Sequence, residues 1–188
     1  MIYIFCAPSG SGKSTMVKHL LTKYPNQFEL SVSCTTRAPR GEEVHGREYY
    51  FISVEEFQQR IARNEFIEYE QVYEGLYYGT LKEEITRIES AGKQVLFDVD
   101  VKGGLNLKRI LGDKATSIFI CPPSIEELRR RLVGRGDTSP EMIEKRLAKA
   151  STEMADKPYF DRVVINDELE NAFQQLDAII DENRDLRR

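Results

Sequence analysis

A chain of 188 residues is long enough for one α/β core without disulfide support and short for two independent domains. Hydrophobic residues make up 40% and charged residues 31% of it, a balance that excludes intrinsic disorder, and no apolar run approaches the ~20 residues of a membrane span. The net charge of −4 argues against a general nucleic-acid binder but leaves room for local basic sites.

The three cysteines and the first residues bear on the cellular compartment. Cys6, Cys34 and Cys121 are an odd number without the spacing of metal ligands, so we expect buried or incidental thiols. The first residues lack the basic flank and the apolar length of a signal peptide, which favours a cytoplasmic protein without a membrane partner. No feature of the sequence indicates an oligomeric state.

Short apolar runs alternate with stretches of helical spacing along most of the chain. Apolar residues recur at helical spacing in residues 17–24, directly after a glycine-rich loop, and again from Leu169 to the end of the chain. Strand, helix and strand in alternation predict an α/β fold with a mainly parallel sheet flanked by helices on both faces. The strand candidates are residues 1–6, 94–98, 117–121 and 162–165.

The stretch from about residue 30 to residue 80 breaks this alternation. Residues 49–52 and 66–69 are strand-like, and a helix between them opens at Ser53, which has capping-box spacing with Glu56. We therefore expect a small mixed α+β subdomain inserted into the parallel core.

A second departure lies in residues 124–150. A helix begins at Ser124, glycines on both sides of Arg135 interrupt it, and Ser139 with the following proline starts another helix. Two helices around a basic elbow suggest a lid. The expected organisation is one domain with a core of residues 1–31, 81–123 and 151–188, an insertion of residues 32–80 and a lid of residues 124–150.

The strongest local motif is APSGSGKS at residues 7–14, between the first strand and the first helix. Gly10 and Gly12 allow backbone N–H groups to converge on phosphate oxygens, Lys13 can bridge the β- and γ-phosphates, and the Ser14 hydroxyl suits Mg²⁺. One departure is Ala7, where the usual loop has glycine. The loop residues expected to hold ATP are Ser9, Gly10, Ser11, Gly12, Lys13, Ser14 and Thr15.

Two aspartates follow the strand candidate at residues 94–98. Asp98 stands at its carboxyl end, where nucleotide phosphates lie in this architecture, and could organise Mg²⁺ through water. Asp100 follows two residues later on the same side of an extended chain. The alternative is that this pair caps the helix that Gly103 begins. These features indicate a nucleotide phosphotransferase or an NTPase and leave the phosphate acceptor open.

Further motifs across nearly the whole chain closely resemble those of guanylate kinases. In this order they are far more specific than the phosphate-binding loop alone. They are SVSCTTRAPR at residues 31–40, GREYYF at 46–51, NEFIE at 64–68, YYGT at 77–80, DVDVKG at 98–103, RLVGRG at 131–136 and VIND at 164–167.

The resemblance implies an acceptor site for GMP in the inserted subdomain. Arginine donors match phosphate oxygens and tyrosine hydroxyls add donors without charge, while one carboxylate, at Glu68, could accept from both guanine N1–H and the 2-amino group. Taken singly, each of these residues is better interpreted as a surface or sheet-covering side chain, and only their shared register with the family favours the binding role. The residues implied are Ser33, Arg37, Arg40, Tyr49, Glu68, Tyr78, Thr80 and Asp100.

The resemblance also assigns roles in the lid and near adenine. Arg131 would contact ATP, and Arg135 and Arg146 would join Lys13 in stabilising the transferring phosphate. Asn166 matches the position near adenine, although Asn before a helix is also an N-cap signature. The neighbouring residues Arg129 and Arg130 are expected to form a solvated helix face.

The expected activity is therefore ATP-dependent phosphorylation of GMP to GDP, with Mg²⁺ as cofactor and ATP and GMP as partners. Two alternatives remain. A small kinase of the same fold could act on another phosphorylated acceptor, such as a ribosyl phosphate, against which Glu68 with Ser33 argues. An interaction module of the same fold could bind protein partners without efficient catalysis, against which the intact Lys13, Ser14 and Arg135 argue.

Overall fold

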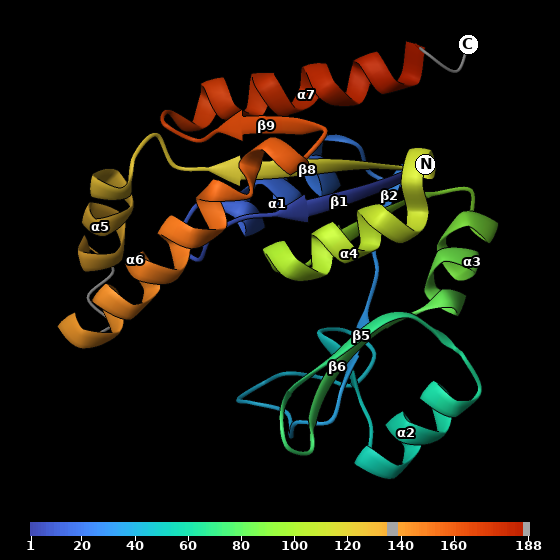
Figure 1. Ribbon diagram of the computed structural model, residues 1–188. Coiled ribbons are helices and arrows are strands. Elements are labelled where there is room, and N and C mark those ends of the chain that lie inside the picture. The colour runs from blue at the N-terminus through green and yellow to red at the C-terminus, as the bar shows by residue number, and fades with distance from the viewer. Residues whose placement is uncertain (135–138, 186–188) are drawn as a thin grey trace.

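The computed structural model describes residues 1–134 and 139–185. Two β-sheets of different size carry the fold, and helices cover the larger one (Figure 1). The elements are β1 (Ile2–Cys6), α1 (Lys13–Lys23), β2 (Phe28–Leu30), β3 (Ser33–Thr35), β4 (Tyr49–Phe51), α2 (Val54–Ala62), β5 (Phe66–Tyr73), β6 (Leu76–Leu81), α3 (Lys82–Ser90), β7 (Gln94–Asp98), α4 (Val101–Leu111), η1 (Gly112–Lys114), β8 (Ala115–Cys121), α5 (Ile125–Gly134), α6 (Pro140–Ala155), η2 (Lys157–Tyr159), β9 (Arg162–Ile165) and α7 (Leu169–Asp185).

The larger sheet has the strand order β2-β7-β1-β8-β9, and all four neighbouring pairs are parallel. The predicted parallel α/β core is confirmed, and β7 and β9 have the bounds expected from the sequence. The edge strand β2 was not predicted. Its three residues are too few to show the period-2 pattern of a strand.

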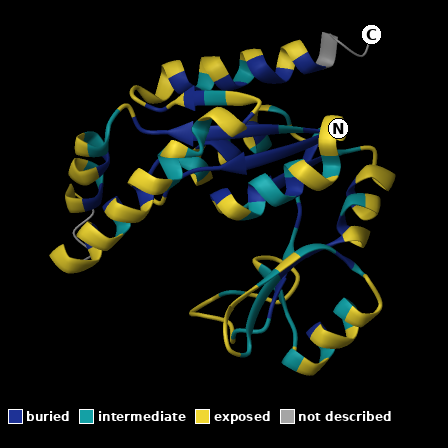
Figure 2. Ribbon diagram, viewed as in Figure 1, coloured by how far each residue is buried: buried dark blue, intermediate teal, exposed yellow. Residues whose placement is uncertain are grey.

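The larger sheet has an apolar core on each face, and successive side chains of β1 point into one core and then the other. Tyr3 and Phe5 pack with residues of α1 and α7, whereas Ile4 and Cys6 pack with residues of α3 and α4. Because successive side chains of a strand point to opposite faces, an uninterrupted apolar run is what a strand covered on both faces requires. Figure 2 shows β1 and its neighbours buried beneath helices whose outer faces are exposed.

The smaller sheet has the order β4-β3-β6-β5 and lies below the larger sheet in Figure 1. Only β3 and β4 pair in parallel, and β6 runs antiparallel to both β3 and β5. Helix α2 packs on it through Phe57, which joins Cys34, Phe66 and Leu81 in a separate core. The Ser53 hydroxyl caps α2 by accepting from the backbone N–H of Glu56 at 3.0 Å, as its spacing predicts.

A buried carboxylate links the two sheets. Glu84 of α3 is 1% exposed and accepts from the backbone N–H of Val32, at 2.8 Å, and from the Tyr50 hydroxyl, at 3.0 Å. Arg87 completes the site with an ion pair at 2.8 Å. Burial opposes ionisation of Glu84, but these three donors outweigh it and lower its pKa. A charge with fixed partners thus ties the segment between β2 and β3 to α3.

Helices α5 and α6 form a small pair with its own apolar core of Leu128, Leu132, Ile143, Leu147 and Ala150. The Ser139 hydroxyl caps α6 by accepting from the N–H of Met142 at 3.4 Å. Arg129 and Arg130 lie on the solvent side and pair with glutamates of the same two helices, as expected for a solvated face.

Candidate active site

The loop between β1 and α1 supplies the phosphate-binding geometry. Gly10 and Gly12 both have φ of 94°, a region that L side chains avoid. Ala7 is buried and has no positive φ, so its replacement of the usual glycine introduces no backbone strain. Behind the loop, the Asn166 side-chain amide donates to the Ser11 carbonyl at 2.8 Å. The residue that follows the edge strand β9 thus stabilises the conformation of the loop.

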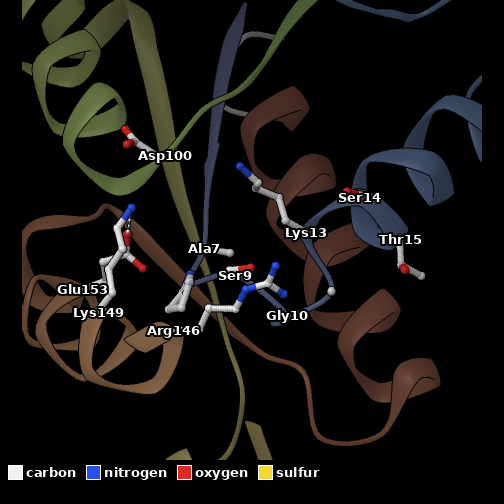
Figure 3. Close-up of a pocket in the computed structure, with 12 residues that line it drawn as sticks. Ala7, Ser9, Gly10, Lys13, Ser14, Thr15, Asp100, Arg146, Lys149 and Glu153 are labelled. Carbon is white, nitrogen blue, oxygen red and sulfur yellow. Dashed lines mark ion pairs between the residues drawn. The ribbon is translucent and has the colours of Figure 1, made fainter. Parts of the chain in front are cut away.

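A cavity of about 430 Å³ opens over this loop. Figure 3 shows the side chains around it, with Arg146 of α6 pointing across the cavity toward the loop. Ser11, a predicted ATP residue, is fully buried and does not line it. The lining residues are Ala7, Pro8, Ser9, Gly10, Gly12, Lys13, Ser14, Thr15, Asp100, Arg146, Lys149 and Glu153.

Lys13 lies at the floor of this cavity with its ammonium already paired. Its Nζ is 2.5 Å from Asp98 Oδ1 and donates to the Val99 carbonyl, also at 2.5 Å. The carboxyl end of β7 therefore orients the lysine of the loop. A phosphate chain entering the cavity would offer this ammonium stronger anionic partners close to its present position.

A second cavity, of about 440 Å³, lies between the two sheets and shares Lys13 and Asp100 with the first. The sequence-predicted residues Ser33, Tyr49, Glu68 and Tyr78 line it. Two spaces of nucleotide size thus adjoin at a lysine and a carboxylate. That arrangement suits a reaction between two bound phosphates.

Glu68 is the central polar group of the second cavity. Its carboxylate accepts from the Thr80 hydroxyl at 2.9 Å. Burial raises the pKa of Glu68, the Thr80 hydrogen bond opposes this shift, and Asp100 and Glu70 add to it. Thr80 itself is fully buried and does not line the cavity, so it supports Glu68 from behind.

Neither of the two arginines predicted to hold the GMP phosphate, Arg37 and Arg40, lines the second cavity. The Arg37 guanidinium forms a bidentate pair with Glu43, at 2.6 and 2.8 Å, and lies over the Tyr49 ring at 4.9 Å. Arg40 is exposed, and its backbone N–H also donates to Glu43, at 2.8 Å. Arg37 and this N–H hold the pKa of Glu43 down to about 2. Glu43 was not singled out from the sequence.

Asp100 caps a helix and also lines both cavities, so the two interpretations of its sequence position do not exclude each other. Its side chain caps α4 by accepting from the backbone N–H of Gly103 at 2.8 Å, and it also lines both cavities. One carboxylate oxygen can cap a helix while the other faces a ligand, because each carboxylate has several lone-pair sites.

The remaining predicted residues are placed as follows. Arg131 of α5 donates to the carbonyls of Asn166 and Asp167, at 2.8 and 3.1 Å, and pairs with Glu127. The Asn166 amide is engaged with the loop, as described above, rather than in the helix cap considered from the sequence. Arg135 lies outside the described residues.

The sequence analysis missed several cavity residues, among them Ser31, Lys149 and Glu153. Ser31 lines the second cavity with a buried hydroxyl that has no hydrogen-bond partner within the described part of the chain. Lys149 and Glu153 line the first cavity from α6. Their positions three and seven residues after Arg146 place all three on one helix face, a signal the sequence did contain.

The cysteines are all buried, as expected. Burial raises the pKa of the Cys6 and Cys34 thiols to about 12, which leaves them protonated and unreactive at neutral pH. Among the described residues, no helix has both the length and the apolar character needed to cross a membrane.

Gly12 offers a test of the loop geometry. A Cβ at Gly12 would lie 2.2 Å from the Asn166 amide nitrogen, in addition to the strain at φ of 94°. We expect Gly12→Ala to lower the free energy of unfolding by about 2–5 kcal/mol, from roughly 1–2 for the backbone and 1–3 for the disturbed buried hydrogen bond. Denaturant titration measures this change.

Gly92 provides the matched control for that substitution. It also has a positive φ, of 72°, but nothing lies within 4 Å of the position that a Cβ would take there, so Gly92→Ala isolates the backbone cost. Equal losses of stability in the two variants would contradict the role given to Asn166.

The loop joins a buried parallel strand to a helix, and its lysine pairs with an aspartate on the neighbouring strand. This geometry defines a P-loop nucleotide phosphotransferase or NTPase. The guanylate kinase family model matches residues 1–183. The chain belongs to the guanylate kinase family and is an enzyme of the nucleoside monophosphate kinase type.

Curated relatives and a solved structure agree with this placement. The guanylate kinase of Bacteroides fragilis is 56% identical over 91% of this chain and 83% of its own length. That of Porphyromonas gingivalis is 52% identical over 93% of each chain. The crystal structure of guanylate kinase from Anaplasma phagocytophilum superposes with a TM-score of 0.70 at 28% identity, covering 97% of this chain and 85% of that one.

Proposed function

We propose that the chain carries out the reaction of its family, ATP-dependent phosphorylation of GMP to GDP, with ATP over the glycine-rich loop and GMP in the cavity between the sheets. The observation that carries this assignment is that the two cavities adjoin at Lys13 and Asp100. Residues 32–80 would then be the GMP-binding subdomain and residues 124–150 the lid.

Guanine selectivity follows from the chemistry of Glu68. An ionised carboxylate can accept from guanine N1–H and the 2-amino group together, whereas adenine presents an acceptor at N1 and no 2-amino group. The Thr80 hydroxyl occupies one Glu68 oxygen from behind and leaves lone pairs facing the cavity. Adenine would leave this half-buried charge without partners, and an unsatisfied buried group costs more than a hydrogen bond gains.

The GMP phosphate would lie near Tyr49 and Tyr78, which line the cavity, with Arg37 and Arg40 approaching from outside it. Arg37 already stacks on Tyr49, so a small movement would bring its guanidinium to the phosphate. Glu43 holds Arg37 in this orientation but also competes with the phosphate for it. A partner exchange of this kind keeps the cation paired in both states.

The donor set around Lys13 fits Mg²⁺. Mg²⁺ prefers oxygen ligands and is usually held by one or two protein groups together with substrate phosphates. Ser14 supplies a hydroxyl and Asp98 a carboxylate, and no group of three His, Cys, Asp or Glu side chains within residues 1–134 and 139–185 could hold a metal without substrate. When bound with ATP, the ion would neutralise phosphate charge.

The residues of this chain would act mainly by positioning and by neutralising charge. Lys13 would bind the β- and γ-phosphates. Arg146 already points toward the loop from α6. Arg135, by family resemblance, would join them from the lid. A GMP phosphate oxygen is itself nucleophilic, so the reaction requires no dedicated general base. Closure of α5 and α6 over the cavity would exclude water and protect ATP from hydrolysis.

An acceptor panel tests this function. The purified chain is incubated with ATP, Mg²⁺ and one of GMP, AMP, CMP, UMP or a ribosyl phosphate, and ADP release is followed. We expect turnover with GMP that exceeds turnover with AMP at least tenfold. Preference for another acceptor would support a different kinase, and absence of turnover with any acceptor would support an interaction module.

A further inference from the structure

Helix α6 contributes two further charged residues to the first cavity besides the predicted Arg146. Lys149 and Glu153 line the same cavity, and Figure 3 shows them beside each other, opposite Lys13. Lys149 Nζ lies 3.4 Å from Glu153 Oε1, one helical turn away. Neither residue has a role in the reaction as proposed so far.

A simple surface ion pair does not account for Glu153. Its side chain is 13% exposed, whereas Glu141, which pairs with Lys145 at 2.8 Å on the same helix, is 79% exposed. Exposed pairs of this spacing contribute little to stability. Burying a carboxylate for so small a gain is unfavourable, which indicates a function that depends on its position.

The charges around Glu153 make this position unusual. Burial raises the pKa of Glu153 and Lys149 opposes this shift. Asp100, the N-cap residue of α4, raises the pKa further, and Lys13 lowers it. The buried thiol of Cys6 also lies within its electrostatic reach. A second carboxylate facing a polyphosphate is repulsive unless a cation stands between them. Lys149 is the cation that the structure provides.

We propose that Lys149 contacts the phosphates of ATP and that Glu153 is a positioning residue that holds the Lys149 ammonium at the cavity wall. Lys149 is 67% exposed, so without a fixed partner its four-carbon chain would sample many rotamers in solvent. The pair reduces that freedom before ATP binds. This inference rests on the proposed function, since it assumes that the first cavity holds ATP.

The proposal makes four predictions for ATP affinity. Lys149→Met raises KM for ATP about tenfold, because one charge-assisted contact is lost, and leaves KM for GMP within about twofold. Glu153→Gln raises KM for ATP about threefold, because Lys149 is less well held. The double variant is no worse than Lys149→Met alone, since Glu153 acts through Lys149. Lys149→Arg keeps the charge and stays within about twofold of the parent protein.

The experiment combines steady-state kinetics with calorimetric titration of a non-hydrolysable ATP analogue, which reads ATP affinity without an acceptor. Lys145→Met and Glu141→Gln are matched controls on α6, because this pair lines neither cavity, and both should leave ATP affinity unchanged. Thermal melting verifies that each variant folds.

An unchanged ATP affinity in Lys149→Met, or additive effects in the double variant, would overturn the proposal. A rise in KM for GMP in place of ATP would do the same. These outcomes differ from failure of the proposed function, in which the parent protein itself shows no GMP-dependent ADP release.

Discussion

Replacement of Lys13 by alanine should lower kcat by about 10²–10³-fold, the usual cost of removing one preorganised charge from a transition state. Lys13 lines both cavities, and Asp98 and Val99 hold its ammonium at the carboxyl end of β7. The affinity for GMP should change by less than about threefold, because the proposed guanine contacts lie on the smaller sheet. Steady-state kinetics with GMP titration measures both quantities.

Lys18→Ala is the control for this variant, since Lys18 lies on the same helix and is exposed. Its kinetics should match those of the parent protein. Near-normal turnover in Lys13→Ala would reject the function assigned to the loop. A loss confined to GMP affinity would instead place Lys13 on the acceptor side.

Glu68→Gln should lower kcat/KM for GMP by about 30- to 150-fold, the equivalent of the ~2–3 kcal/mol of hydrogen bonds to a charged group. The amide keeps the size of the carboxylate but loses its charge and turns one donor toward guanine donors. The ratio of kcat/KM for GMP to that for AMP should decrease, because AMP does not form these hydrogen bonds with Glu68 and has none to lose. Since burial raises the pKa of Glu68, removing its charge should leave the protein at least as stable.

The measurement is kcat/KM for GMP and AMP in both proteins, with ATP affinity as an internal control. Glu55→Gln, an exposed carboxylate on α2 of the same subdomain, controls for loss of charge. In the parent protein, KM for GMP should rise as pH falls through the raised pKa of Glu68, at higher pH than for an ordinary glutamate, and Glu68→Gln should lack this rise. An unchanged GMP/AMP ratio in the variant would remove Glu68 from the recognition site.

The core of this fold could be predicted because its strands and helices carry strong local patterns. The strand β7, with the bounds expected for it, is an apolar run between a glycine and a carboxylate, and the helix α2 opens at a capping serine. The edge strand β2 and the link that Glu84 makes to Val32 and Tyr50 have no such pattern. Their partners lie far apart in sequence, and only the folded chain brings them together.

In the candidate site, too, the features with a local sequence pattern could be predicted, whereas contacts between distant residues could not. The loop motif identified Lys13 because its spacing is local, but nothing in the sequence pairs that lysine with Asp98. Asn166 was considered as an adenine contact or a helix cap, and the sequence did not indicate that its amide supports the loop at Ser11, a contact across 155 positions. Lys149 and Glu153 were overlooked because charged residues on a helix are ordinarily solvated.

Transfer of a labelled phosphoryl group tests the central claim most directly. The chain is incubated with ATP labelled at the γ-phosphate, Mg²⁺ and an equimolar mixture of GMP, AMP, CMP and UMP, and the products are separated. The two adjoining cavities and the carboxylate at Glu68 predict that the label moves into GDP and that little is released as free phosphate. Label found mainly in free phosphate, or in a diphosphate other than GDP, would contradict direct transfer from ATP to GMP.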